Sequence, residues 1–151
     1  MELNKKCFFI TPIGNENSEE RQKMTELIKS LTPVLKQRGF TFKCASELTN
    51  AGSITKDIIN CLSTYDLVIA NLTGLNPNVM YELGVRRGVK EPAILIAEND
   101  TNLPFDIADI RVIFYQHTVS GIIELKEKLP QFIDKIFKRS IGSFFLPKPD
   151  I

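Results

Sequence analysis

The sequence predicts a three-layer α/β domain, in which helices cover both faces of a five-stranded parallel sheet. Short apolar runs alternate along the chain with longer stretches whose apolar residues recur at helical spacing. Several of the short runs are apolar throughout their middle, as is typical of strands buried on both faces of a parallel sheet. The length of 151 residues suits one domain rather than two.

The first strand is predicted at residues 6–11, before a break at Gly14. Ser18 is a good helix N-cap, and the two glutamates after it suit the positive end of a helix. Apolar residues at helical spacing predict a helix that ends at Gly39. Pro33 lies inside this pattern and is expected to kink or split the helix.

The second and third strands are predicted at residues 40–45 and 66–71. Ser53 can cap the helix between them. After the third strand, Asn78 is the predicted cap of a third helix, which ends near Gly88.

The fourth and fifth strands are predicted at residues 92–97 and 111–116, and a last helix at 119–139. We expect the domain to span residues 1–140. Residues 141–151 are expected to form a C-terminal tail with aromatic residues, which remains loose, docks on a neighbouring subunit or packs on its own subunit.

Composition excludes several classes of protein. Hydrophobic content is 43%, charged content 25% and net charge +1, so nothing indicates binding to nucleic acid or to an anionic membrane. The three cysteines are widely spaced, and with no secretory signal they predict reduced thiols in the cytoplasm. No metal-ligand cluster, Gly-x-Gly-x-x-Gly or P-loop pattern is present, so we expect no metal and no bound cofactor.

Right-handed crossovers between parallel strands leave few topologies, and the order 2-1-3-4-5 is the commonest at this size. This order is that of a flavodoxin-like or Rossmann-like domain. It brings the first and third strands together, so the loops at residues 11–18 and 72–78 should line one crevice at the carboxyl edge of the sheet.

Glu82 lies at this edge, in the predicted first turn or so of the third helix, four residues after Asn78. The helix N-terminus favours an ionised carboxylate, which could attack the anomeric carbon of a sugar or stabilise its oxocarbenium ion. The alternative is a solvated ion pair with Arg86 at i+4, and spacing alone favours that alternative. Gly84 could serve helix-to-strand packing.

The residues near Glu82 can likewise be interpreted as ligand-binding or as structural. Asn76 and Asn78 could bind sugar hydroxyls or simply form a turn and a cap. Thr11 and Gly14, with the free amides near Ser18, could accept a phosphate. At the opposite end of the sheet Asp66 is expected to be structural. His117, the one histidine, is predicted to be a surface residue without a partner.

Six segments together resemble a known family. They are Ile10-Thr-Pro-Ile-Gly14, Ser53-Ile-Thr55, Asp66-Leu-Val-Ile-Ala-Asn-Leu-Thr73, Asn76-Pro-Asn-Val-Met-Tyr-Glu-Leu-Gly84, Pro104-Phe-Asp-Ile107 and Arg111-Val-Ile-Phe-Tyr115. In this order they are similar to the small bacterial domains related to nucleoside 2-deoxyribosyltransferases, which are akin to TIR domains. The fourth segment is specific and the others are supportive.

The resemblance implies cleavage of an N-glycosidic bond, with base transfer or hydrolysis, and Glu82 matches the family's nucleophile. The substrate would be a nucleoside, a nucleotide or NAD, and related members act in bacterial defence and signalling. A homo-oligomer is expected, because related sites are often completed by a neighbour. The implied substrate contacts are Thr11, Pro12, Ile13, Gly14, Thr73, Gly74, Asn76, Asn78 and Tyr81.

The sequence also departs from the family. Asn76 and Asn78 replace an aspartate that handles the base, and closer members often carry Asp at the position of Asn71 and His at that of Arg87. Asparagine cannot be a general acid or base, and loss of such a group lowers catalysis by about 10²–10⁴-fold. A nucleotide-binding sensor and a TIR-like scaffold or oligomerisation module without turnover are therefore the alternatives to an enzyme.

Overall fold

The computed structural model of the chain describes residues 3–47, 54–89, 91–104 and 112–145. Within them the strands form a five-stranded sheet of order β2-β1-β3-β4-β5, and every neighbouring pair is parallel. The strands are β1 (Lys5–Ile10), β2 (Phe40–Cys44), β3 (Leu67–Asn71), β4 (Ala93–Glu98) and β5 (Val112–Tyr115). The predicted fold class and strand order are confirmed.

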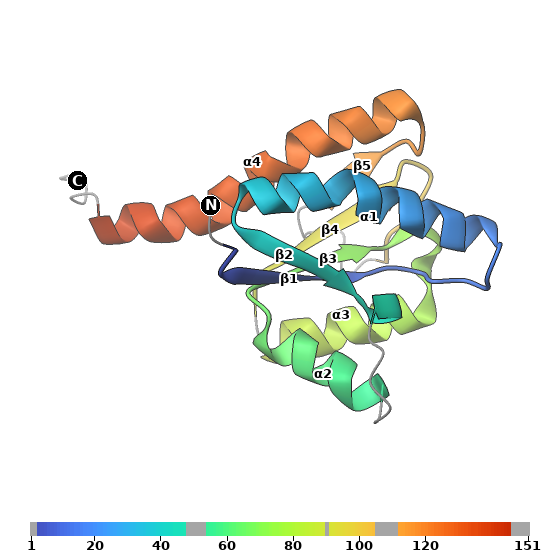
Figure 1. Cartoon of the computed structure of the whole chain (residues 1–151), viewed down its shortest axis with the longest axis horizontal. Coiled ribbons are helices and arrows are strands. Elements are labelled where there is room, and N and C mark those ends of the chain that lie inside the picture. Colours follow the sequence, from blue (N-terminus) through green and yellow to red (C-terminus); the bar gives the residue numbers. More distant parts are fainter. Residues whose placement is uncertain (1–2, 48–53, 90, 105–111, 146–151) are drawn as a thin grey trace.

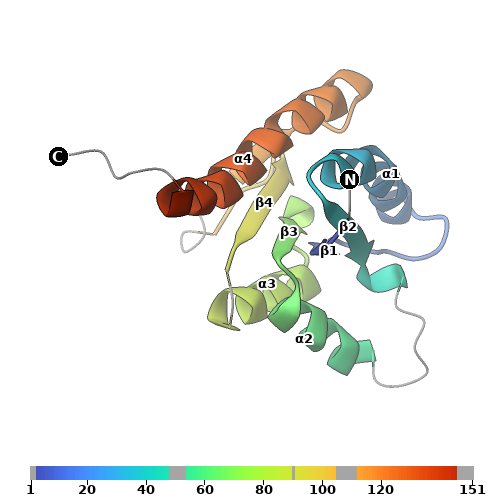
Figure 2. The same cartoon turned by 60° about the vertical axis from the view of Figure 1, so that its left-hand side comes forward.

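Helices cover both faces of the sheet. α1 (Glu19–Gln37) and α4 (Val119–Phe145) pack on one face, and α2 (Ile54–Thr64) and α3 (Pro77–Val89) pack on the other (Figure 1). Figure 2 shows the same layers after a turn of 60°. Two short 3-10 turns, η1 (Ala45–Glu47) and η2 (Thr73–Leu75), follow β2 and β3.

The apolar middle of each strand supplies both cores, because successive side chains point to opposite faces. In β3, Leu67 and Ile69 pack under α1 and α4, whereas Val68 and Ala70 pack against α2 and α3. All five residues of β3 are buried. The same alternation of side-chain direction at the end of each strand determines which face of the sheet a residue of the carboxyl edge points to.

Two helices differ from the predictions. Ser18 caps α1 as predicted, but α1 continues through Pro33 without a split. The flanking residues Leu31, Val34 and Leu35 are buried against the sheet, and this packing holds the turn that lacks one backbone hydrogen bond. α4 runs to Phe145 rather than ending at residue 139.

Asp66 is structural, as expected, since its carboxylate accepts a hydrogen bond from the Lys6 backbone amide at 2.8 Å. The predicted cap Ser53, the first residue of the predicted fifth strand, Arg111, and residues 146–151 of the tail lie outside the described residues. In the described part of the chain, no helix is both long and apolar enough to cross a membrane.

Candidate functional site

Two hollows adjoin the end of β1 at the carboxyl edge of the sheet, one on each face, and Thr11 and Pro12 belong to both. The larger has a volume of about 490 Å³, within the usual range for small-molecule sites, and the smaller about 210 Å³. The single crevice predicted between the loops after β1 and β3 is therefore divided by the end of β1.

The larger hollow, here called the Glu82 hollow, opens between the β1 loop, α2 and the start of α3. Its described lining residues are Thr11, Pro12, Ile13, Gly14, Ala45, Ile58, Ile59, Leu62, Asn76, Asn78, Tyr81 and Glu82. One wall is apolar, from α2, and the facing wall from α3 is polar. Glu82 is the one charged side chain among these residues. The structure thus brings Glu82 together with seven of its nine predicted neighbours.

The local start of α3 explains how Glu82 reaches this position. The cap is Asn76 rather than Asn78, since the Asn76 side-chain oxygen accepts hydrogen bonds from the Asn78 and Val79 amides at 2.9 and 3.3 Å. Pro77 is the first helical residue, where its missing N–H costs nothing. Asn78 is thereby free of the capping role, and at i−4 from Glu82 it lies on the same helix face.

The shift of the cap by two residues changes the electrostatics of Glu82. The carboxylate now lies in the second turn of α3, beyond the first turn where the helix dipole acts. No hydrogen bond or ion pair to it forms within the described residues. Burial therefore dominates and raises the pKa of Glu82 from 4.5 to about 7. The expectation that the helix would favour the ionised form is wrong here, and the carboxylate is instead poised near neutral pH.

The ion pair between Glu82 and Arg86 does not exist. Arg86 is fully buried and donates hydrogen bonds to the backbone oxygens of Leu62, Tyr65 and Pro92, at 2.7 to 3.3 Å. Two of these oxygens belong to the C-terminal end of α2, where the helix dipole favours a cation. Arg87, next to it, pairs with Glu91 on the surface. The interpretation of Glu82 as one half of a solvated ion pair is therefore wrong, because Arg86 is not available as its partner.

The interpretation of Gly84 as a residue for helix-to-strand packing finds no support, because a Cβ built on it would meet no atom within 4 Å. The residue is exposed, so helix-to-strand packing does not require a glycine there.

Thr73 and Gly74, the remaining predicted contacts, line the smaller hollow on the α1 side instead. Its described lining residues are Thr11, Pro12, Glu19, Glu20, Lys23, Met24, Asn71, Thr73, Gly74 and Glu98. The side chain of Asn71 continues the alternation of β3 and points to the face of Ile69, under α1. The expectation that Thr73 and Gly74 share one crevice with Glu82 is therefore wrong, because the chain leaves β3 on the α1 side before it turns back to α3.

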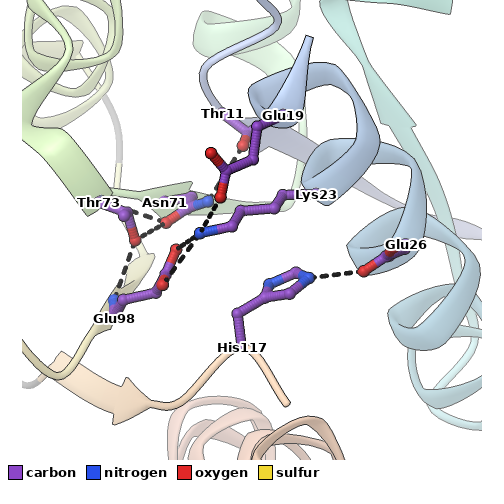
Figure 3. A network of polar contacts seen from close by, with 8 residues as sticks. All are labelled: Thr11, Glu19, Lys23, Glu26, Asn71, Thr73, Glu98 and His117. Carbon is purple, nitrogen blue, oxygen red and sulfur yellow. Dashed lines mark hydrogen bonds and ion pairs between the residues drawn. The ribbon is translucent and has the colours of Figure 1, made fainter. Parts of the chain in front are cut away.

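A polar network crosses the smaller hollow (Figure 3). The Thr73 amide, which can only donate, bonds to Asn71 Oδ1 at 3.2 Å, so the amide nitrogen of Asn71 must face Thr11 Oγ1, at 3.2 Å. Thr73 Oγ1 donates to the same oxygen at 2.8 Å and accepts from the Glu98 amide at 2.9 Å. Asn71 therefore links the ends of β1 and β3, and Thr73 extends this link to the end of β4.

Sequence reasoning missed Lys23 and Glu98. Lys23 Nζ bridges α1 to β4 through Glu98 at 3.0 Å and also approaches Glu19 at 3.6 Å. Hydrogen bonding to Glu98 is the main cause that raises the pKa of Lys23. The position of Glu98 at the carboxyl end of a predicted strand was the signal that could have identified it.

The prediction for His117 is wrong. Its side chain is only 10% exposed, and Nε2 lies 2.7 Å from the Glu26 carboxylate. This pair joins the end of β5 to α1, well apart from Glu82 in the chain and on the opposite face of the sheet. Among the described residues no group of three or more His, Cys, Asp and Glu side chains is arranged to hold a metal ion.

Comparison with known proteins identifies the fold. No protein-family model and no curated protein sequence matches the chain. A 2-deoxyribosyltransferase from Bacillus psychrosaccharolyticus is similar in structure, with a TM-score of 0.60 and 15% identity over 80% of this chain and 90% of that chain. The CMP N-glycosidase BcmB of Clostridium botulinum gives a TM-score of 0.56 and 20% identity over 83% of this chain and 98% of that chain. The chain therefore shares the fold of these two proteins.

Proposed function

We propose that the protein cleaves the N-glycosidic bond of a nucleoside or nucleotide, by transfer of the glycosyl group to another base or to water, with Glu82 as the nucleophile. The observation that carries this proposal is one half-buried carboxylate lining a hollow of about 490 Å³ at the carboxyl edge of the sheet. The two similar structures, a deoxyribosyltransferase and a CMP N-glycosidase, support the same chemistry.

The reaction follows from the two walls of the Glu82 hollow. Ile58 and Ile59 offer an apolar surface to the flat face of a base, while Asn78 and the side-chain amide nitrogen of Asn76 can donate hydrogen bonds to the sugar. The oxygen of Asn76 is already used in capping α3. The sugar is thus held next to Glu82.

In the first step an oxygen of ionised Glu82 forms a bond to the anomeric carbon, the carbon–nitrogen bond breaks, and its electron pair leaves with the base, which takes a proton from water. In the second step water or another base attacks the same carbon and frees the Glu82 carboxylate. Since burial raises the pKa of Glu82 to about 7, the ionised form that the first step needs is accessible near neutral pH.

The direct test follows release of free base by chromatography, using deoxynucleosides, ribonucleosides, their 5′-monophosphates and NAD. Glu82→Gln should abolish release, and Glu124→Gln, at an exposed position on α4, should leave it unchanged. Equal release by the wild type and Glu82→Gln would rule out the proposal.

A nucleotide-binding sensor is the second candidate, because the described lining of the Glu82 hollow offers no second carboxylate and no histidine to protonate the base. It predicts that ligands of the panel raise the melting temperature without any release of base. A TIR-like module would bind none of them. A homo-oligomer and a cytoplasmic location remain predictions, and light scattering of the purified chain tests the first.

A further inference from the structure

The turn between β1 and α1 carries a feature that the proposed reaction has not used. Arg21, in the first turn of α1, donates from Nε to the backbone oxygen of Ile13 at 3.1 Å and from a terminal nitrogen to that of Gly14 at 3.2 Å. Two successive carbonyls are therefore held by one half-buried guanidinium, whose rigid fork suits paired acceptors.

The two hydrogen bonds from Arg21 fix the direction of the N–H groups of Gly14 and Asn15. The peptide bonds of this turn are trans, and in a planar trans peptide the N–H points opposite to the carbonyl. Because the oxygens of Ile13 and Gly14 face Arg21, the N–H groups of Gly14 and Asn15 face away from it. No acceptor within the described part of the chain takes either N–H.

The turn is fixed in this form by a glycine. Gly14 has a φ of +68°, and a Cβ on it would lie 2.6 Å from Ser18 Oγ and 2.7 Å from Glu20 Cβ. Successive N–H groups next to a left-handed residue form a concavity that binds anionic or strongly accepting oxygens. Ile13 and Gly14 line the Glu82 hollow and do not line the smaller one.

We propose that Arg21 is a positioning residue, which turns the N–H groups of Gly14 and Asn15 toward the mouth of the Glu82 hollow to bind an oxygen at the 5′ end of the substrate's sugar. The inference rests on the proposed function. If the base lies on the apolar α2 wall and the anomeric carbon lies at Glu82, the 5′ oxygen is the remaining hydrogen-bond acceptor of the substrate, and the N–H groups of the β1 turn can donate to it. None of the described lining residues is basic, so no side chain of the hollow draws an anionic oxygen to another wall.

The test measures binding by calorimetry in the Glu82→Gln background, where no turnover occurs. The probes are 2′-deoxycytidine, its 5′-monophosphate and 2′,5′-dideoxycytidine, with the matching adenine set. Arg21→Met should raise the Kd of ligands with a 5′ oxygen by about 10–100-fold, the value of two lost hydrogen bonds. The Kd of the 5′-deoxy ligands should change less than twofold.

Two further variants separate positioning from folding. Arg21→Lys keeps the charge but cannot span both carbonyls, so it should restore part of the lost affinity. Arg38→Met removes an arginine at the other end of α1, where it pairs with Asp134, and should leave every Kd unchanged. A loss confined to the monophosphate identifies the bound group as phosphate, and a loss shared by nucleoside and monophosphate identifies the 5′ oxygen itself.

The inference is overturned if Arg21→Met raises the Kd of the 5′-deoxy ligands as much as the Kd of the ligands that keep the 5′ oxygen. It is also overturned if the substitution changes no Kd. Binding that does not depend on Arg21 leaves the proposed function standing. If neither the wild type nor Glu82→Gln binds any probe, the proposed function fails and the inference fails with it.

Discussion

Glu82 is accessible from the hollow and is also buried enough to have a raised pKa, whereas an ordinary surface glutamate is accessible but keeps its usual pKa. It lies where a substrate can reach it, and burial raises its pKa to about 7. A nucleophile must be ionised, so kcat/KM should rise about tenfold per pH unit below pH 7 and become level above it. Rates measured from pH 5 to 9 at constant ionic strength check this. A rate that falls above pH 7 would instead assign Glu82 the role of an acid.

The same carboxylate should make stability depend on pH. Its pKa is higher in the folded chain, at about 7, than the ordinary value of 4.5 that applies in the unfolded chain, so folding favours the protonated form. Stability therefore falls as pH rises from about 4.5 to 7, because only the unfolded chain gains from ionisation there.

Glu82→Gln removes this penalty. The variant should melt about 2–4 °C above the wild type at pH 8, and the difference should vanish near pH 4.5. Melting curves at the two pH values, with Glu124→Gln as the exposed control, test this. A variant that is less stable than the wild type at pH 8 would contradict the assigned burial.

At the scale of elements, Arg86 links α3 to the end of α2 and to the start of β4. Arg86→Met leaves three backbone oxygens without their donor and should lower the free energy of unfolding by about 3 kcal/mol or more. Its neighbour provides the control, because Arg87→Met removes only an exposed ion pair worth about 0–1 kcal/mol. Chemical denaturation of both variants measures the contrast, and equal losses would refute the role of Arg86.

Two helical glycines should respond in opposite ways to alanine. At Gly121 in α4 a Cβ would overlap the Gln116 backbone oxygen, so the end of β5 or the helix must move, at a cost of about 1–3 kcal/mol. At Gly84 in α3 the space is open, and alanine should stabilise the helix by about 0.5–1 kcal/mol. The denaturation midpoints of Gly121→Ala and Gly84→Ala measure these opposite changes in stability. Destabilisation by Gly84→Ala would mean that α3 is packed more closely than the structure shows.

At the scale of the whole molecule, the chain alternates strand and helix in the pattern that specifies the sheet. Apolar runs and caps such as Ser18 predict the five strands, because the strands of a parallel sheet bury both faces. The handedness of the crossovers and the commonest order at this size then predict the strand order and the edge where Glu82 lies. These features are local or follow from topology.

What the sequence could not reveal depends on contacts between distant residues. The spacing predicts Asn78 as the cap of α3, whereas the hydrogen bonds to the side-chain oxygen of Asn76 make Asn76 the cap. The partner of Arg86 was predicted one helical turn away and lies instead in the backbone of α2 and the loop before β4. The division of the edge into two hollows follows from the side to which Thr11 and Asn71 point, which motif proximity does not convey.

A ligand that binds the folded chain should stabilise the whole molecule. At a concentration 100 times its Kd, a nucleoside or nucleotide adds about 2.7 kcal/mol, which corresponds to about 5–10 °C in melting temperature for a chain of this size. Thermal shift with the same ligand panel measures this, and the enzyme and the sensor both predict it. A flat response to every ligand would favour the scaffold alternative.

The most direct test of a nucleophilic Glu82 is intact-protein mass spectrometry after rapid quenching with a substrate of the panel. We predict a protein heavier by one glycosyl unit, with the adduct on the peptide that contains Glu82, and no adduct on Glu82→Gln. Turnover that continues in Glu82→Gln, or an adduct carried by another residue, would contradict the account.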